Sequence, residues 1–143
     1  MDSILSNKAL VVPLAAWLVA QVLKTLILLI RNRRLNLSYI TYGGMPSAHT
    51  TLVCALATSI AIVYGFQSAA FAVSTIFAAV VMYDAAGVRQ TVSAQSAILN
   101  RILDELFKGK PAFEQRFREF IGHTRLEVVV GAALGILLAW LWT

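Results

Sequence analysis

Residues 9–30 read ALVVPLAAWLVAQVLKTLILLI, an apolar run interrupted by a single charge at Lys24. A helix needs about 20 mostly apolar residues to cross a bilayer, so this run is long enough for one transmembrane helix. The whole chain fits that setting, because 59% of its 143 residues are hydrophobic and only 13% are charged. Its mean hydropathy of +0.74 is too high for an ordinary soluble domain. The sequence therefore predicts a membrane protein.

Three further apolar runs follow, at residues 50–64, 69–83 and 126–142. The two middle runs are short, rich in small residues, and joined by Gly65-Phe66-Gln67, a pattern typical of a tight hairpin of closely packed membrane helices. We expect an all-α fold, a polytopic membrane helical bundle with about four transmembrane helices. At this chain length, residues 1–143 are expected to form a single membrane-embedded domain.

The segment 88–122, between the third and fourth runs, has a different pattern. Its apolar residues recur at helical spacing and form one stripe: Ile98, Leu99, Ile102, Leu103, Leu106 and Phe107. Gly109-Lys110-Pro111 interrupts the stripe, and residues 112–121 predict a second short amphipathic helix. We expect both helices to lie on the membrane surface or to cap the bundle.

The basic residues gather in two loops. Ten of the twelve lie there, namely Arg31, Arg33, Arg34, Arg89, Arg101, Lys108, Lys110, Arg116, Arg118 and Arg125. Because cytoplasmic loops carry an excess of Lys and Arg, both loops are predicted to be cytoplasmic and both termini to lie outside, in a bacterial plasma membrane or a plastid membrane. The net charge of +5 then serves contacts with anionic lipid headgroups, and the chain has no nucleic-acid-binding motif.

With both charged loops on one side, eight polar residues from four places in the sequence reach the same membrane level. They are Lys24 and Arg31 late in the first run, Ser47 and His49 before the second, Asp84 and Arg89 after the third, and His123 and Glu127 before the fourth. Lys24 and Arg31 are seven residues apart and share one helix face. An ionisable residue inside a span is costly and usually functional. The alternative is that the long side chain of Lys24 extends to the membrane surface.

Residues 43–50 read GGMPSAHT and open the second run. Gly44 and the glycine before it allow the backbone to approach a ligand closely, and Pro46 suits the first turn of a helix. Ser47 offers a hydroxyl there, and the free N–H groups of a helix start attract an anion. The motif is equally compatible with a capped helix in which His49 is incidental.

His123 and Glu127 are four residues apart and can meet on one face of a helix. A carboxylate there can accept a hydrogen bond from one imidazole nitrogen and leave the other free to attack or to transfer a proton. The pair is also compatible with a histidine and a glutamate that only satisfy each other. Metal binding is less well supported, because the spacing matches no standard zinc motif.

These residues, in this order, resemble the superfamily of type 2 phosphatidic acid phosphatases and vanadium haloperoxidases, and most of all its small divergent membrane branch. The superfamily motifs are K-x6-R-P, P-S-G-H and S-R-x5-H-x3-D. This chain keeps K-x6-R at 24–31, P-S-x-H at 46–49 and H-x3-acid at 123–127. Where the family has Pro, Gly and Asp, this chain has Asn32, Ala48 and Glu127.

The third motif departs most, because the Ser-Arg pair before the histidine is absent. Residues 84–89 read DAAGVR and resemble a segment of the divergent branch. By that resemblance, Arg89 is expected to supply the missing phosphate contact, with Arg116, Arg118 and Arg125 as possible substitutes.

The resemblance implies a division of roles at one site. His123 would be the nucleophile that forms a phosphohistidine, Glu127 would orient it, and His49 would protonate the leaving oxygen. The implied phosphate-binding residues are Lys24, Arg31, Ser47 and Arg89, and the supporting residues are Asp84, Gly44 and Pro46. Enzymes of this kind use no metal, and no cofactor is expected.

A phosphate site at headgroup depth favours a substrate with a lipid tail, such as phosphatidate, phosphatidylglycerophosphate, or a polyprenyl phosphate or diphosphate. A bundle this small is also compatible with a homodimer among the membrane lipids. Two other functions remain open. A catalytically inactive protein that binds or carries a lipid phosphate is favoured by the altered motifs and opposed by the two histidines. An assembly subunit with loops that dock a partner leaves Lys24 unexplained.

Overall fold

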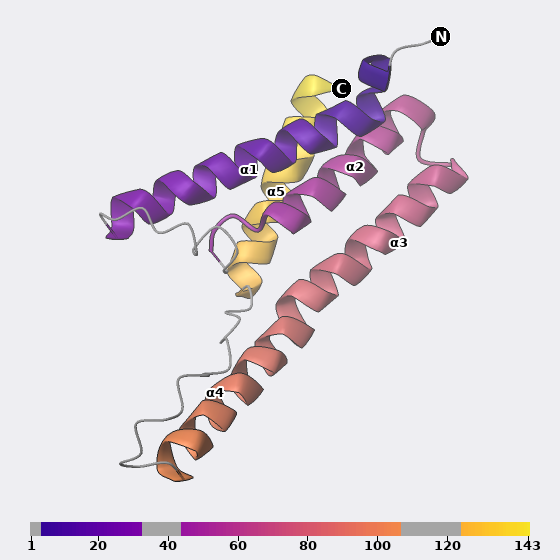
Figure 1. Ribbon diagram of the computed structural model, residues 1–143. Helices are drawn as coiled ribbons and strands as arrows, with labels where there is room; N and C mark the ends of the chain where they lie inside the picture. Colours follow the sequence, from indigo (N-terminus) through magenta and orange to yellow (C-terminus); the bar gives the residue numbers. More distant parts are fainter. Residues whose placement is uncertain (1–3, 33–43, 107–123) are drawn as a thin grey trace.

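The computed structural model describes residues 4–32, 44–106 and 124–143, and every regular element in these ranges is helical (Figure 1). In chain order the elements are η1 (Ile4–Ser6), α1 (Lys8–Asn32), α2 (Ala48–Tyr64), α3 (Ala69–Tyr83), the π-helical turn η3 (Asp84–Val88), α4 (Arg89–Leu106) and α5 (Arg125–Trp142). The structure confirms the prediction of an all-α membrane helical bundle.

All four apolar runs form helices, but they differ in length. Three stretches are long and apolar enough to cross a membrane: Lys8–Ile30, Ala69–Gly87 and Arg125–Trp142. The fourth helix, α2, has 17 residues and is about 25 Å long, at the lower end of the spanning range. It lies at the centre of the bundle and packs against α1, α3 and α5. The apolar helix that falls short of the other three stretches, α2, is thus the one that packs against α1, α3 and α5.

Contacts at both ends of the bundle establish the helix directions. The Ser47 N–H donates to the Glu127 carbonyl at 3.2 Å, so α2 and α5 begin at the same end and run parallel. At the opposite end, the Ser59 and Thr143 hydroxyls lie 3.0 Å apart, and Lys8 Nζ donates to the Thr143 carbonyl. Both ends of the chain therefore lie together, away from the starts of α2 and α5 (Figure 1). Which end faces the cytoplasm stays a prediction.

The contact between α2 and α5 is unusually close because α5 presents glycines to it. A Cβ built on Gly131 would lie 2.6 Å from the Ser47 carbonyl oxygen, and one on Gly135 would collide with the Thr51 carbonyl oxygen. The two glycines are four residues apart, so they stand one turn above the other on the same face. Such a G-x-x-x-G pair lets two membrane helices approach through their backbones.

Hydroxyl groups line the same contact and are hydrogen-bonded within it. Thr51 Oγ1 is 3.0 Å from the carbonyl oxygens of both Ser47 and Gly131, so its single hydrogen is shared between the two helices. Ser47, Thr51 and Ser59 are all completely buried. Because a bilayer offers no water to replace a missing partner, these bonds define which faces of α2 and α5 meet.

The remaining interior is built from small apolar side chains. One cluster joins Val12 and Ala16 of α1 to Ala55 of α2 and Ala139 of α5. A second cluster joins Val53 and Cys54 of α2 to Ala78 of α3. The larger apolar side chains face outward, as expected for a surface that contacts lipid tails rather than water.

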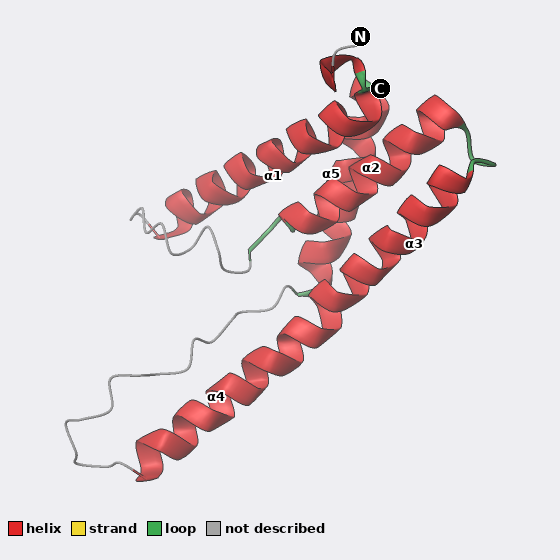
Figure 2. Cartoon of the chain, turned by 45° about the vertical axis from the view of Figure 1, so that its right-hand side comes forward, coloured by secondary structure: helices red, strands yellow, loops and turns green. Residues whose placement is uncertain are grey.

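The segment after α3 departs from expectation. α4 continues α3 through η3 as one long rod that extends past the rest of the bundle (Figure 2). Its principal described contacts are with η3. The sequence predicted that this segment lies on the membrane surface or caps the bundle. Residues 89–106 do not cap the bundle. The physical reason is that no proline interrupts 84–88, so the helix does not turn back. A location on the membrane surface stays a prediction, and the second predicted helix, 112–121, lies outside the described residues.

We expect Gly135→Ala to destabilise the protein by about 1–3 kcal/mol, the usual cost of forcing an extra methyl group into a packed contact. The new carbon would collide with the Thr51 carbonyl and lie 3.1 Å from the Ala55 nitrogen. Thermal unfolding in a mild detergent measures the change. Gly87→Ala is the matched control, because a Cβ there meets nothing within 4 Å. Equal losses for both variants would contradict the close-contact explanation.

Candidate functional site

Lys24 is the first site residue that the structure places. Its side chain is only 5% exposed although it lies on a long apolar helix. Its Cε would be 3.2 Å from a Cβ built on Gly44, so the lysine stem lies against the backbone of that glycine. Gly44 has φ +146°, a conformation that strongly favours glycine. Glycine is thus favoured at position 44 by its backbone angle, and a side chain there would also crowd Lys24.

Lys24 and Glu127 carry opposite charges at the same end of the bundle. Glu127, at the start of α5, is close enough for the opposite charges to attract, and both side chains have interaction partners. A lysine from α1 and a glutamate from α5 therefore meet beside the backbone that leads into α2.

Ser47 holds the start of α2 in place. It is the residue immediately before the helix, yet its side chain makes no capping bond to the backbone. Its hydroxyl instead lies 2.9 Å from Thr50 Oγ1, and its N–H donates to the Glu127 carbonyl. The preceding Pro46 is also buried and follows a cis peptide bond. The predicted phosphate ligand Ser47 is thus enclosed between α2 and α5.

Glu127 has a structural task that the motif comparison did not anticipate. Its Oε2 accepts the Thr124 N–H at 3.1 Å, and Thr124 Oγ1 accepts the Glu127 N–H at 3.3 Å. This reciprocal pair is a capping box at the start of α5. The sequence carried the signal, because T-x-x-E directly before an apolar run is typical of a helix start. Glu127 therefore links the cap of α5, through its charge, to Lys24.

Two more of the predicted site residues, His49 and Asp84, lie on helices that the structure describes. His49 is exposed in the first turn of α2, two residues after Ser47. Asp84 opens η3, is half-buried, and has an interaction partner. η3 also packs against α5. A π-helical turn often marks a functional position, and this one coincides with the DAAGVR segment.

The remaining predicted residues are placed only by their backbone or not at all. Arg31 belongs to the last turn of α1, and Arg89 opens α4. His123 lies outside the described residues, directly before Thr124 in the sequence. The structure thus brings together Lys24, Gly44, Ser47 and Glu127, with His49 one half-turn from Ser47.

This end of the bundle suits an anion. α2 and α5 both begin here, and the start of a helix carries a partial positive charge. Lys24 lies buried at the same end, near the Glu127 carboxylate. Among the residues that the structure describes, no group of three His, Cys, Asp or Glu side chains is placed to hold a metal ion. The arrangement can therefore attract a phosphate through amide dipoles and a lysine.

Comparisons with known proteins show the family to which the chain is similar. The model of the divergent PAP2 family, PAP2 being the type 2 phosphatidic acid phosphatases, matches residues 5–138. The chain is also 37% identical over 147 residues to the uncharacterized membrane protein YuiD of Bacillus subtilis (strain 168), a match that covers 94% of this chain and 93% of that protein. No solved structure matches the chain. The family match spans every predicted site residue and confirms the resemblance.

We expect Glu127→Gln to separate the two roles of Glu127. Glutamine keeps an oxygen that can accept the Thr124 N–H, but it removes the negative charge near Lys24. Lys24 would then lie buried without its counter-charge, so the free energy of unfolding should fall by about 1–3 kcal/mol. Thermal unfolding in detergent measures the loss.

Two variants control for that interpretation. Glu105→Gln removes an exposed carboxylate from α4 and should leave the unfolding temperature unchanged. Lys24→Met combined with Glu127→Gln should recover most of the lost stability, because neither charge is then left alone. Lys24→Met and Glu127→Gln are also measured singly. If the stability that the double variant loses equals the sum of the two single losses, the two residues do not interact.

Proposed function

The chain belongs to the divergent PAP2 family, and on this basis we propose that it is an integral membrane phosphatase. Its substrate would be a lipid phosphate or a polyprenyl phosphate or diphosphate, hydrolysed without a metal through a phosphohistidine at the cytoplasmic face. The similar protein of Bacillus subtilis is itself uncharacterized, so the site residues have to carry the argument.

The observation that supports this function best is the meeting of Lys24, Gly44, Ser47 and Glu127 at one end of the bundle. They come from three motifs that are far apart in the sequence. An apolar helix has no structural need for a buried lysine, and its cost in a membrane is accepted where it serves a function. A site for phosphoryl transfer needs such fixed positive charge around the equatorial oxygens.

The proposed reaction has two steps. An imidazole nitrogen of His123 attacks the terminal phosphorus, and a P–N bond forms while the bond from phosphorus to the leaving oxygen breaks. His49 donates a proton to that oxygen and releases the lipid alcohol, or the lipid monophosphate when the substrate is a diphosphate. His49 then removes a proton from a water molecule, which attacks the phosphohistidine and releases inorganic phosphate, restoring His123.

The other residues hold the phosphoryl group and the nucleophile in place. Lys24 would stabilise the charge that develops on the oxygens, and Arg31 and Arg89 would supply further positive charge. Glu127 would orient His123, a role that fits its fixed position in the cap of α5. In this proposal Ser47 contributes through its backbone more than through its enclosed hydroxyl.

The burial of Ser47 also favours a second candidate function. A serine that is completely buried and bonded to Thr50 does not reach a phosphate without a rearrangement. Ala48, which replaces the family glycine, is buried in the same contact. Both features are compatible with a protein that binds or carries a lipid phosphate without hydrolysing it.

Substitution of the nucleophile tests the catalytic proposal. Wild-type protein in detergent should release inorganic phosphate from at least one member of a panel of lipid phosphates and diphosphates. His123→Ala should reduce that release to about a thousandth or less, because no other group forms the covalent intermediate. Phosphate release measures the activity, and circular dichroism verifies the helices. Full activity of His123→Ala would refute this mechanism, whereas lipid binding without release by the wild type would favour the carrier.

Vanadate provides an independent test that needs no mutation. It adopts the five-coordinate geometry of the transferring phosphoryl group, and transition-state analogues bind far more tightly than substrates. We therefore expect vanadate to inhibit phosphate release in competition with the lipid. A chelator is the parallel control and should have no effect. Activity that is insensitive to vanadate, or is lost with the chelator, would contradict a metal-independent phosphate site.

A further inference from the structure

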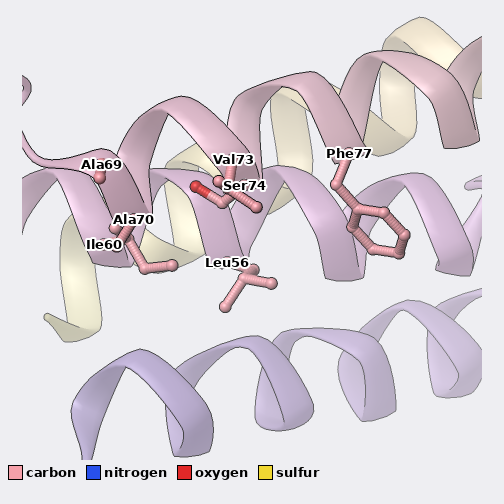
Figure 3. A pocket seen from close by; sticks show the side chains of 7 residues that line it. All are labelled: Leu56, Ile60, Ala69, Ala70, Val73, Ser74 and Phe77. Atoms are coloured by element: carbon pink, nitrogen blue, oxygen red, sulfur yellow. The ribbon is translucent and has the colours of Figure 1, made fainter.

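An apolar groove lies between α2 and α3, away from the polar end of the bundle (Figure 3). It is a shallow, open groove with a volume of about 470 Å³. The lining residues are Leu56, Ile60, Ala69, Ala70, Val73, Ser74 and Phe77. The turn 65–67 joins the two helices shortly before Ala69.

The chemistry of the lining specifies a hydrocarbon ligand. Ser74 is the one polar residue among the seven, and its hydroxyl already donates to the Phe71 carbonyl at 3.0 Å. A polar ligand would therefore find almost no hydrogen-bond partner in the groove. A flexible apolar chain needs no such partner and gains van der Waals contacts along both walls.

The groove is aligned with His49 along α2. Leu56 and Ile60 follow His49 by seven and eleven residues, which are close to two and three full turns of an α-helix. The three residues therefore form one stripe, with Leu56 about 10 Å and Ile60 about 16 Å farther along the helix axis than His49. His49 is exposed, so the stripe is accessible at its polar end.

We propose that this groove binds one hydrocarbon chain of the lipid phosphate whose headgroup lies at Lys24 and His49. The inference rests on the proposed function for the identity of the headgroup. Because His49, Leu56 and Ile60 form one stripe on α2, we favour a substrate chain in the groove over a helix from a second copy of the protein. A lipid with its phosphate at the start of α2 has its tail directed along that stripe into the groove.

Photolabelling tests the groove independently of turnover. The probe is phosphatidic acid with a diazirine in one acyl chain, compared with phosphatidylcholine that has the same chains, in vesicles that contain the full-length protein. Phosphatidic acid should label residues 56–60 and 69–77 more strongly than phosphatidylcholine does. Equal labelling by both lipids would show that the groove holds bulk lipid only and would overturn the proposal, as would the absence of labelling.

Two alanines of α3 provide a matched pair of variants. Ala70→Phe places a ring in the groove, whereas Ala79→Phe places the same ring at an exposed position of α3 outside the lining. Ala70→Phe should reduce the specific labelling, and Ala79→Phe should leave it unchanged. Equal effects of the two variants would overturn the proposal. If Val73→Cys instead joined two copies by a disulfide, the groove would be an interface between copies and the proposal would be wrong.

Hydrolysis separates failure of this inference from failure of the proposed function. With a long-chain lipid phosphate, Ala70→Phe should lower kcat/KM about five-fold, the cost of roughly ten lost carbon–carbon contacts. With a short-chain, water-soluble analogue it should change little. If Ala70→Phe lowered kcat/KM equally on both substrates, the groove proposal would be wrong, but the proposed phosphatase activity would still hold. If the wild type hydrolysed neither substrate, the catalytic proposal would fail and the photolabelling result would decide the groove.

Discussion

Between α2 and α5, two backbones touch where most membrane helices would touch through side chains. Gly131 and Gly135 provide the space, and the carbonyl groups of Ser47 and Thr51 occupy it. Because Thr51 Oγ1 reaches carbonyl groups on both helices, the contact has a defined register as well as a short distance. Packing of this kind compensates for the weak hydrophobic force between helices in lipid. The short α2 can therefore sit at the centre, with α1 and α3 packed against it.

The polar end of the bundle depends on that register. When α2 and α5 are aligned, the Ser47 N–H meets the Glu127 carbonyl, and the two helix starts lie at one level. Lys24 of α1 can then reach past Gly44 toward Glu127. A shift of α5 by one turn would separate the lysine from its counter-charge. The same contact that stabilises the membrane core thus positions the charges from which the proposed phosphate site is built.

The π-helical turn after α3 gives the bundle its asymmetry. Without a break at 84–88, α4 continues beyond the other helices instead of folding back over the polar end (Figure 2). Toward the opposite end, the apolar groove lies between α2 and α3. Charge and hydrocarbon surfaces are therefore separated along the length of α2, as a ligand with a polar head and an apolar tail would require.

The sequence by itself was sufficient for the membrane class, the four helical runs and the set of motif residues, because run length and residue spacing are local properties. The capping box of Thr124 and Glu127 was also readable locally. Only the tertiary structure revealed that α2 is central, that Ser47 is enclosed, and that Lys24 lies against Gly44 with Glu127 near it. These features depend on which faces of distant helices meet. That choice is set by the fit of glycines and carbonyl groups across α2 and α5, which no periodicity within one helix specifies.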